Sequence, residues 1–162
     1  MAIITTDVIY KLSGGAANTD PNLSLGGAVS TQAMPAALFD DVTSAQALAG
    51  LTEYRCFYVK NNHGSLTLQA AVAWIVSNTT GARIAIGLGT SAVNAIEQTV
   101  ANEATAPTTV AFTQPATKGA GLSIGNIPAG QTKAIWVRRT VAASTPAAND
   151  TYTLRVEGDT AP

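Results

Sequence analysis

The chain has 162 residues, the size of a single domain, and carries a net charge of −1. Only 12% of its residues are charged, against about 25% in an ordinary domain, so it lacks the basic surface that nucleic-acid binding requires. The sequence contains no long apolar run and no cationic leader, and we therefore expect neither a membrane span nor a secretion signal.

Alternation of apolar and polar residues, together with aromatic and β-branched enrichment, predicts strands along most of the chain. In chain order we expect them at 8–13, 53–61, 66–77, 83–88, 109–113, 122–124, 133–141 and 151–157. The clearest alternation lies in the last of these strands. There we expect Tyr152, Leu154 and Val156 to face the core.

Turn residues separate these strands at short intervals. The segment 61–65 has the length of a hairpin loop, 78–81 separates the next two strands, and 127–131 predicts a tight turn. One short helix is expected at 44–51, with Thr43 or Ser44 as its N-cap and Gly50 as its end. About eight short strands joined by turns are typical of sandwiches and barrels.

We therefore predict an all-β fold, an antiparallel β-sandwich of the immunoglobulin-like kind with a long N-terminal arm or loop. Residues 1–35 would form an N-terminal strand and a Gly/Asn-rich arm, and residues 36–162 the sandwich, within one domain overall. The arm holds few large apolar side chains, so we expect it to be mobile until it packs on a neighbouring subunit. Its expected contact residues are Leu23, Leu25 and Met34.

Residues that could carry chemistry are few. His63 is the only histidine and lies in a turn, and Cys56 is the only cysteine and lies in an apolar strand. These two cannot build a zinc site, and Cys56 is expected to be a buried, unreactive thiol suited to folding in a reducing cytoplasm. We predict no catalytic residues, no metal site and no cofactor. A calcium site built from Asp20, Asp40 or Asp41 is the alternative to solvated turn carboxylates.

Trp74 and Trp136 both lie within predicted strands, and we expect them in the core rather than on a sugar-binding platform. Arg138 and Arg139 follow Trp136 closely, so one of the two must point to the opposite face of its sheet. Because arginine is enriched at protein interfaces, we count Arg138 and Arg139 among the candidate subunit-contact residues.

Several segments of the chain carry a resemblance, and they follow one another in order from residue 11 to residue 140. They read KLSGGAANTDPN and LGG near the start, EYRCFYVKN with HGSLTL in the middle, and then IGLGTS, EQTVANE, IPAGQ and WVRRT. In these segments the chain resembles a group of tailed-bacteriophage virion structural proteins.

This resemblance implies a virion component without catalytic residues, made in the host cytoplasm. We expect a capsid decoration (cement) protein that binds and stabilises the outer surface of the head. Its partners would be the major capsid protein and further copies of itself, as a homotrimer near three-fold positions. The alternatives are a tail or fibre module and a carbohydrate-binding module for host recognition, with an enzyme as the remaining possibility. Neither nucleic acid nor membrane is an expected partner.

Overall fold

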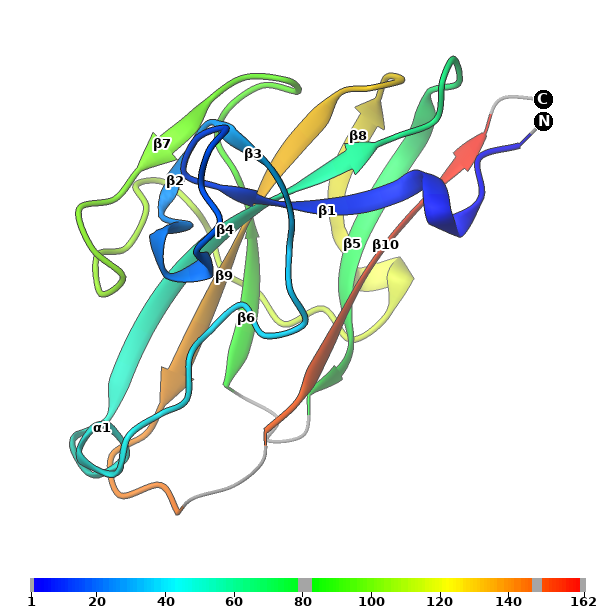
Figure 1. The fold of residues 1–162 in the computed structure, drawn as a ribbon. Coiled ribbons are helices and arrows are strands. Elements are labelled where there is room, and N and C mark those ends of the chain that lie inside the picture. The colour runs from blue at the N-terminus through cyan, green and yellow to red at the C-terminus, as the bar shows by residue number, and fades with distance from the viewer. Residues whose placement is uncertain (1, 79–82, 147–149, 161–162) are drawn as a thin grey trace.

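The computed structural model describes residues 2–78, 83–146 and 150–160, which form strands joined by loops and very short helices (Figure 1). The strands are β1 (Val8–Ser13), β2 (Gly26–Gly27), β3 (Val29–Ala33), β4 (Leu51–Asn61), β5 (Leu68–Asn78), β6 (Ile84–Leu88), β7 (Glu97–Thr99), β8 (Leu122–Ile127), β9 (Thr132–Val141) and β10 (Tyr152–Thr160). The helical elements are α1 (Ser44–Ala49) and the 3-10 turns η1 (Thr5–Asp7), η2 (Pro21–Leu23) and η3 (Lys118–Ala120).

Three antiparallel sheets make up the fold. The largest has the order β3-β1-β4-β9-β6, the second β10-β5-β8, and the third is the two-stranded ladder β2-β7. The five-stranded and three-stranded sheets enclose the main hydrophobic core, in which Leu12, Phe57, Ile86, Ile127 and Ile135 are all almost fully buried. The predicted all-β sandwich is thereby confirmed, whereas its immunoglobulin-like identity is not.

The predicted strand faces are also confirmed. In β10, Val156 is buried and Tyr152 and Leu154 pack against the main core, while Thr153 and Arg155 are exposed. A period of two places alternate side chains on opposite faces of a strand. The alternation in β10 therefore predicted its core side correctly.

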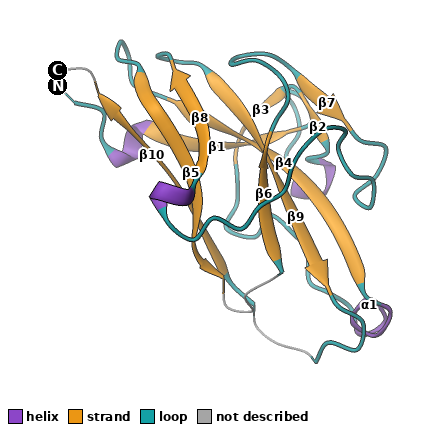
Figure 2. Cartoon of the chain, turned by 180° about the vertical axis from the view of Figure 1, so that it is seen from behind, coloured by secondary structure: helices purple, strands orange, loops and turns teal. Residues whose placement is uncertain are grey.

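Successive strands cross from one main sheet to the other. β4 belongs to the five-stranded sheet and β5 to the three-stranded sheet, and the same change of sheet recurs from β5 to β6 and from β8 through β9 to β10 (Figure 2). The hairpin expected at 61–65 is therefore wrong, because this loop bridges two layers instead of pairing its flanking strands. Most of the turn expected at 78–81 lies outside the described residues.

Asn61, which is fully buried, explains why two of these crossings lie side by side. Its amide nitrogen donates to the carbonyl oxygens of Leu66 at 2.8 Å and Ile127 at 2.9 Å. Its own backbone nitrogen donates to the carbonyl of Gln131 at 3.0 Å. One asparagine thus provides hydrogen-bond donors to backbone carbonyls in both the 61–68 and the 127–132 connection. Buried carbonyls in such connections need partners that strand pairing does not supply.

The short helix and most of the other strands follow the sequence prediction. α1 begins after Thr43, whose hydroxyl accepts from the backbone of Gln46, and it ends at Gly50, where φ is 78°. The strand expected at 109–113 does not form. That segment contributes only a single bridge between Thr113 and Ile86, and it runs across the outer face of the five-stranded sheet.

The N-terminal arm differs most from the prediction. Its backbone is bonded to the rest of the domain at several points: Cys56 N donates to Ser24 O at 2.7 Å, Val100 N donates to Leu25 O at 2.9 Å, and β3 pairs with β1. Ser24 is completely buried. The segment does not extend away as a free arm, because main-chain hydrogen bonds replace the side-chain burial that it lacks.

A third layer covers the outer face of the five-stranded sheet. We call it the cap: β2, β7 and the loops 89–96 and 100–112. Beneath it lies a smaller core of Cys56, Tyr58, Val100, Ala134 and Trp136. Both tryptophans are buried as predicted, with Trp136 at 0% exposure in this smaller core and Trp74 at 8%.

Candidate functional site

A buried polar cluster surrounds Glu97 in β7, which is only 3% exposed. One carboxylate oxygen accepts from the backbone nitrogen and the hydroxyl of Thr90, at 3.2 and 3.1 Å. The other accepts from the backbone nitrogen and the hydroxyl of Ser91, at 2.9 and 2.8 Å. Four donors therefore converge on one carboxylate and hold the 89–96 loop of the cap.

These hydrogen bonds determine the ionisation of Glu97. Burial alone would raise its pKa, but the donors from Ser91 and Thr90 outweigh that effect and lower the pKa to about 2. The group is therefore a permanent carboxylate at neutral pH, and its lone pairs are occupied by the loop. Such a group stabilises a loop and has no free basicity with which to take a substrate proton.

Two side chains of the five-stranded sheet reach into the same cluster. Lys133 donates to the carbonyls of Gly89, at 2.9 Å, and Ser91. Burial lowers the pKa of Lys133, and the charge of Glu97 acts in the opposite direction. The Tyr58 hydroxyl donates to Gly27 O at 2.6 Å and accepts from Glu97 N at 3.0 Å, so it contacts both strands of the cap ladder.

A second charged group lies on the inner face of β4 and β9. Glu53, Arg55 and Arg139 are buried or nearly so, and Arg139 forms an ion pair with Glu53. Arg55 is 0% exposed and donates to Glu103 at 2.5 Å and to Asn22 at 3.0 Å. Each of these buried charges therefore has a charged partner, as burial demands.

The residues that could carry acid–base or metal chemistry lie apart. His63 accepts at Nδ1 from the backbone nitrogens of Ser65, at 3.2 Å, and Leu66, at 3.0 Å, and so stabilises its own turn. Cys56 is fully buried, and burial raises the pKa of its thiol. Within the described residues, no group of three or more His, Cys, Asp or Glu side chains could hold a metal ion.

The three aspartates considered for calcium are also separate. Asp20 caps η2 by accepting from Asn22 N at 2.8 Å. Asp40 lies 3.5 Å from Arg139, and both Asp40 and Asp41 are exposed. This arrangement matches solvated turn carboxylates.

The candidate subunit-contact residues differ in their environments. Leu23 is 61% exposed, whereas Leu25 packs on the smaller core and Met34 on the main core. The Arg138 guanidinium lies 5.2 Å from the ring centroid of Phe112, and Arg139 is the ion-paired residue of the inner face. Of these five residues, Leu23 is therefore the one whose side chain is largely free for a partner.

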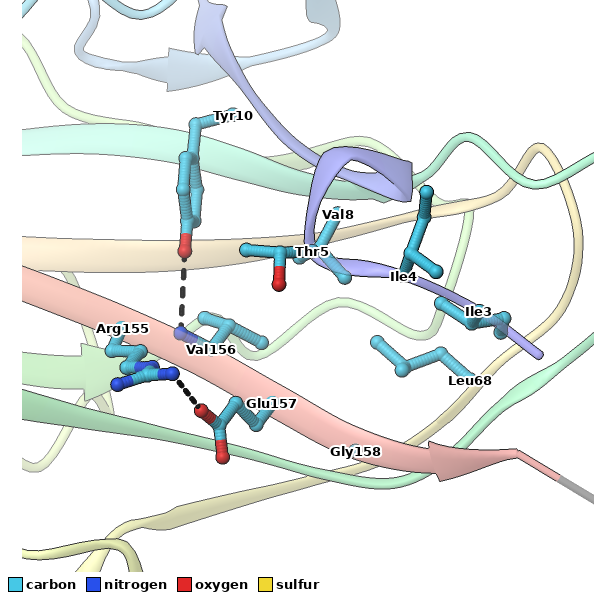
Figure 3. A pocket seen from close by; sticks show the side chains of 10 residues that line it. All are labelled: Ile3, Ile4, Thr5, Val8, Tyr10, Leu68, Arg155, Val156, Glu157 and Gly158. Carbon is cyan, nitrogen blue, oxygen red and sulfur yellow. Dashed lines mark hydrogen bonds and ion pairs between the residues drawn. The ribbon is translucent and has the colours of Figure 1, made fainter.

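A shallow groove runs between the N-terminal residues and β10 (Figure 3). Its walls are mainly apolar, with Ile4 60% exposed at the rim. Its charged groups, Arg155 and Glu157, pair with each other at 2.6 Å, and Tyr10 accepts from Val156 N at 3.2 Å. The groove is therefore a mainly apolar junction between the two main sheets.

All nine aromatic side chains of the chain are buried or half-buried. The ring of Trp74 in β5 lies under the guanidinium of Arg155, whose Cζ is 5.8 Å from the ring centroid.

Sequence reasoning missed Glu97 and Lys133 as the centre of the cap, and the only local signal was the Thr90-Ser91 pair of hydroxyl donors. No family model matches the chain. Neither a curated protein nor a solved structure matches it. No helix within the described ranges is long and apolar enough to cross a membrane.

Proposed function

We propose that the chain is a structural subunit of a tailed-bacteriophage virion that decorates the outer surface of the head. The virion assignment rests on the resemblance that runs from residue 11 to residue 140. The structural role rests instead on the internal hydrogen bonds and ion pairs that the buried polar side chains form.

The observation that supports the structural role is that the buried ionisable side chains are hydrogen-bonded or ion-paired to other parts of the protein. Glu97 and Lys133 bind the cap loop, Glu53 binds Arg139, and Arg55 binds Glu103. An enzyme leaves acid, base or nucleophile groups exposed to a substrate. Side chains committed to internal bonds instead favour a rigid module whose surface, low in charge, contacts other proteins.

Within this proposal the partners are the major capsid protein and further copies of the chain, assembled as a homotrimer near three-fold positions. Of the five candidate contact residues, Leu23 is the one that a partner could cover, because 61% of its area is exposed and would gain burial. It lies in η2, shortly before the cap ladder.

The test uses virions produced by the genome that encodes the chain. Mild chaotrope should release the chain from purified particles while head shells and tails stay intact by electron microscopy. Release only when the tail is disrupted would place the chain in the tail or a fibre instead. Absence of the chain from purified virions would overturn the proposal.

A matched pair of variants tests the contact. Leu23→Asp should abolish rebinding to stripped particles, because the carboxylate would be desolvated at the interface. Leu48→Asp is the control: Leu48 is 70% exposed on α1, at the other end of the molecule from β2 (Figure 1). Both variants should keep the wild-type melting temperature. Equal rebinding of the two would show that Leu23 makes no contact.

A further inference from the structure

The loop from β3 to α1 closes one side of the sandwich with two inserted side chains. We call residues 35–42 the strap. Its flanks, 35–37 and 40–41, are exposed, yet Leu38 is 1% exposed and Phe39 is 8% exposed, both within the main core. In Figure 1 the strap descends from the end of β3 to α1 along the sandwich.

Side chains, rather than the backbone, hold the strap in place. Among the described residues, one hydrogen bond joins the backbone of the strap to the rest of the fold. Arg139 donates it to Asp40 O at 2.7 Å. The Phe39 ring lies against two guanidinium groups, with its centroid 4.7 Å from Arg139 Cζ and 5.5 Å from Arg55 Cζ. Two inserted side chains and one arginine are therefore its anchors.

The strap covers the part of the sandwich interior that is charged. Glu53 and Arg139 face each other in the β4–β9 register, and Arg55 follows two residues along the same face. Elsewhere this face carries Phe57, Ile135 and Val137 in the apolar core. Opening the strap would return buried ions to water, which lowers the cost of opening compared with exposing an apolar core.

We propose that the strap is a lid that opens as a unit, independently of global unfolding, and uncovers the Glu53–Arg55–Arg139 row. The strap has one hydrogen bond to its backbone from the rest of the fold and only two buried side chains, Leu38 and Phe39. Segments held this sparsely open before the rest of a native protein does. This inference does not depend on the virion role proposed above.

Thiol labelling with an aromatic disulfide reagent tests the lid, because the chain supplies its own internal control. In the Leu38→Cys variant, the introduced thiol and the native Cys56 would both be buried, but only the introduced thiol lies on the strap. We expect the introduced thiol to react at least about ten-fold faster than Cys56 under native conditions. Equal rates for the two thiols would overturn the proposal.

A second pair of variants tests the anchor in the Leu38→Cys background. Phe39→Leu removes the ring from Arg55 and Arg139, and it should accelerate labelling of the strap thiol several-fold while leaving the Cys56 rate unchanged. Phe112→Leu is the matched control, because its ring lies against Arg138 in the cap and not on the strap. Acceleration by Phe112→Leu, or none by Phe39→Leu, would contradict the proposed anchor.

If Leu38→Cys does not fold, the wild-type chain provides the same test. A protease that cuts before aspartate should cleave the native protein at Asp40 or Asp41 before it cleaves elsewhere in the described chain. Cleavage only under denaturing conditions would show that the strap does not open by itself.

Discussion

The backbone nitrogen of Glu97 donates to the hydroxyl of Tyr58 at 3.0 Å, and the two residues are 39 positions apart in the sequence. The same hydroxyl donates to Gly27 in the other strand of the ladder. A single tyrosine of the five-stranded sheet therefore binds both strands of the cap, and the carboxylate of Glu97 then organises the loop that follows β6.

Acid should destabilise the protein through Glu97. Its pKa in the folded state is about 2, below the ordinary value of 4.5. The associated stability is present above pH 4.5 and is lost as the pH falls toward 2. The difference corresponds to about 3 kcal/mol of unfolding free energy as an upper value. Urea unfolding at a series of pH values should show this loss.

Glu97→Gln should remove that dependence. The amide would place N–H donors against the donors of Ser91 or Thr90, so we expect a cost of about 2–4 kcal/mol at neutral pH. The variant's stability should change less than that of the wild type between pH 4.5 and 2. An identical pH profile in both proteins would mean that other carboxylates cause the acid sensitivity.

Asn61→Ala should be among the most damaging polar substitutions. It leaves the carbonyls of Leu66 and Ile127 without their buried donor, and His63 N without its acceptor. We expect a loss of about 3 kcal/mol in chemical denaturation. Asn126→Ala is the control: Asn126 is exposed and accepts from Ala70 N, so its loss should cost below about 1 kcal/mol. Similar costs for both would refute the proposed role of Asn61.

Val156→Asp tests the core face of β10. Val156 is 5% exposed, and an unpaired carboxylate there should cost several kcal/mol and lower the melting temperature. Thr153→Asp, at an exposed position of the same strand, should change the unfolding free energy by only about 0.5 kcal/mol. An unchanged melting temperature for Val156→Asp would show that this face is not buried in solution.

Cys56 in the wild-type protein should resist labelling. Its side chain is fully buried, and burial raises its pKa, so the reactive thiolate is scarce at neutral pH. Labelling should be slow in the native protein and fast in denaturant. Rapid native labelling would mean that the cap opens readily over Cys56.

Strand β10 could be predicted from the sequence because it buries one face, and its alternation records that burial directly. Strands β4, β6 and β9 are largely buried on both faces, and their aromatic and β-branched residues identified them instead. The cap ladder could not be predicted. Gly26 and Gly27 have no side chains to alternate, and a Cβ at Gly26 (φ +93°) would collide with the carbonyl of Gln98. The requirement for glycine there comes from a neighbour far away in the sequence.

The same limit applies to the polar sites. Nothing near Glu97 in the sequence indicates that Tyr58 will bind its backbone or that Lys133 will bind the loop it holds, because these contacts form only through tertiary packing. The arm was predicted to be mobile from its poor apolar content. Its main-chain bonds to Cys56 and Val100 depend on partners that no local pattern reveals.

The crossing of successive strands between the two main sheets has a consequence for synthesis on the ribosome. None of the β4–β5, β5–β6, β8–β9 or β9–β10 connections forms a hairpin, so an emerging strand cannot pair with the strand made just before it. Tyr10 and Val156, which are joined by a hydrogen bond, lie 146 residues apart in the sequence, so Val156 is synthesised long after Tyr10. β4 can pair with β1, which precedes it, but its other edge pairs with β9. At about 5–20 residues per second, that edge stays unpaired for on the order of 10 s. The three-stranded sheet is complete only after β10 has left the exit tunnel, so a chain truncated before residue 152 would leave β5 exposed along one edge.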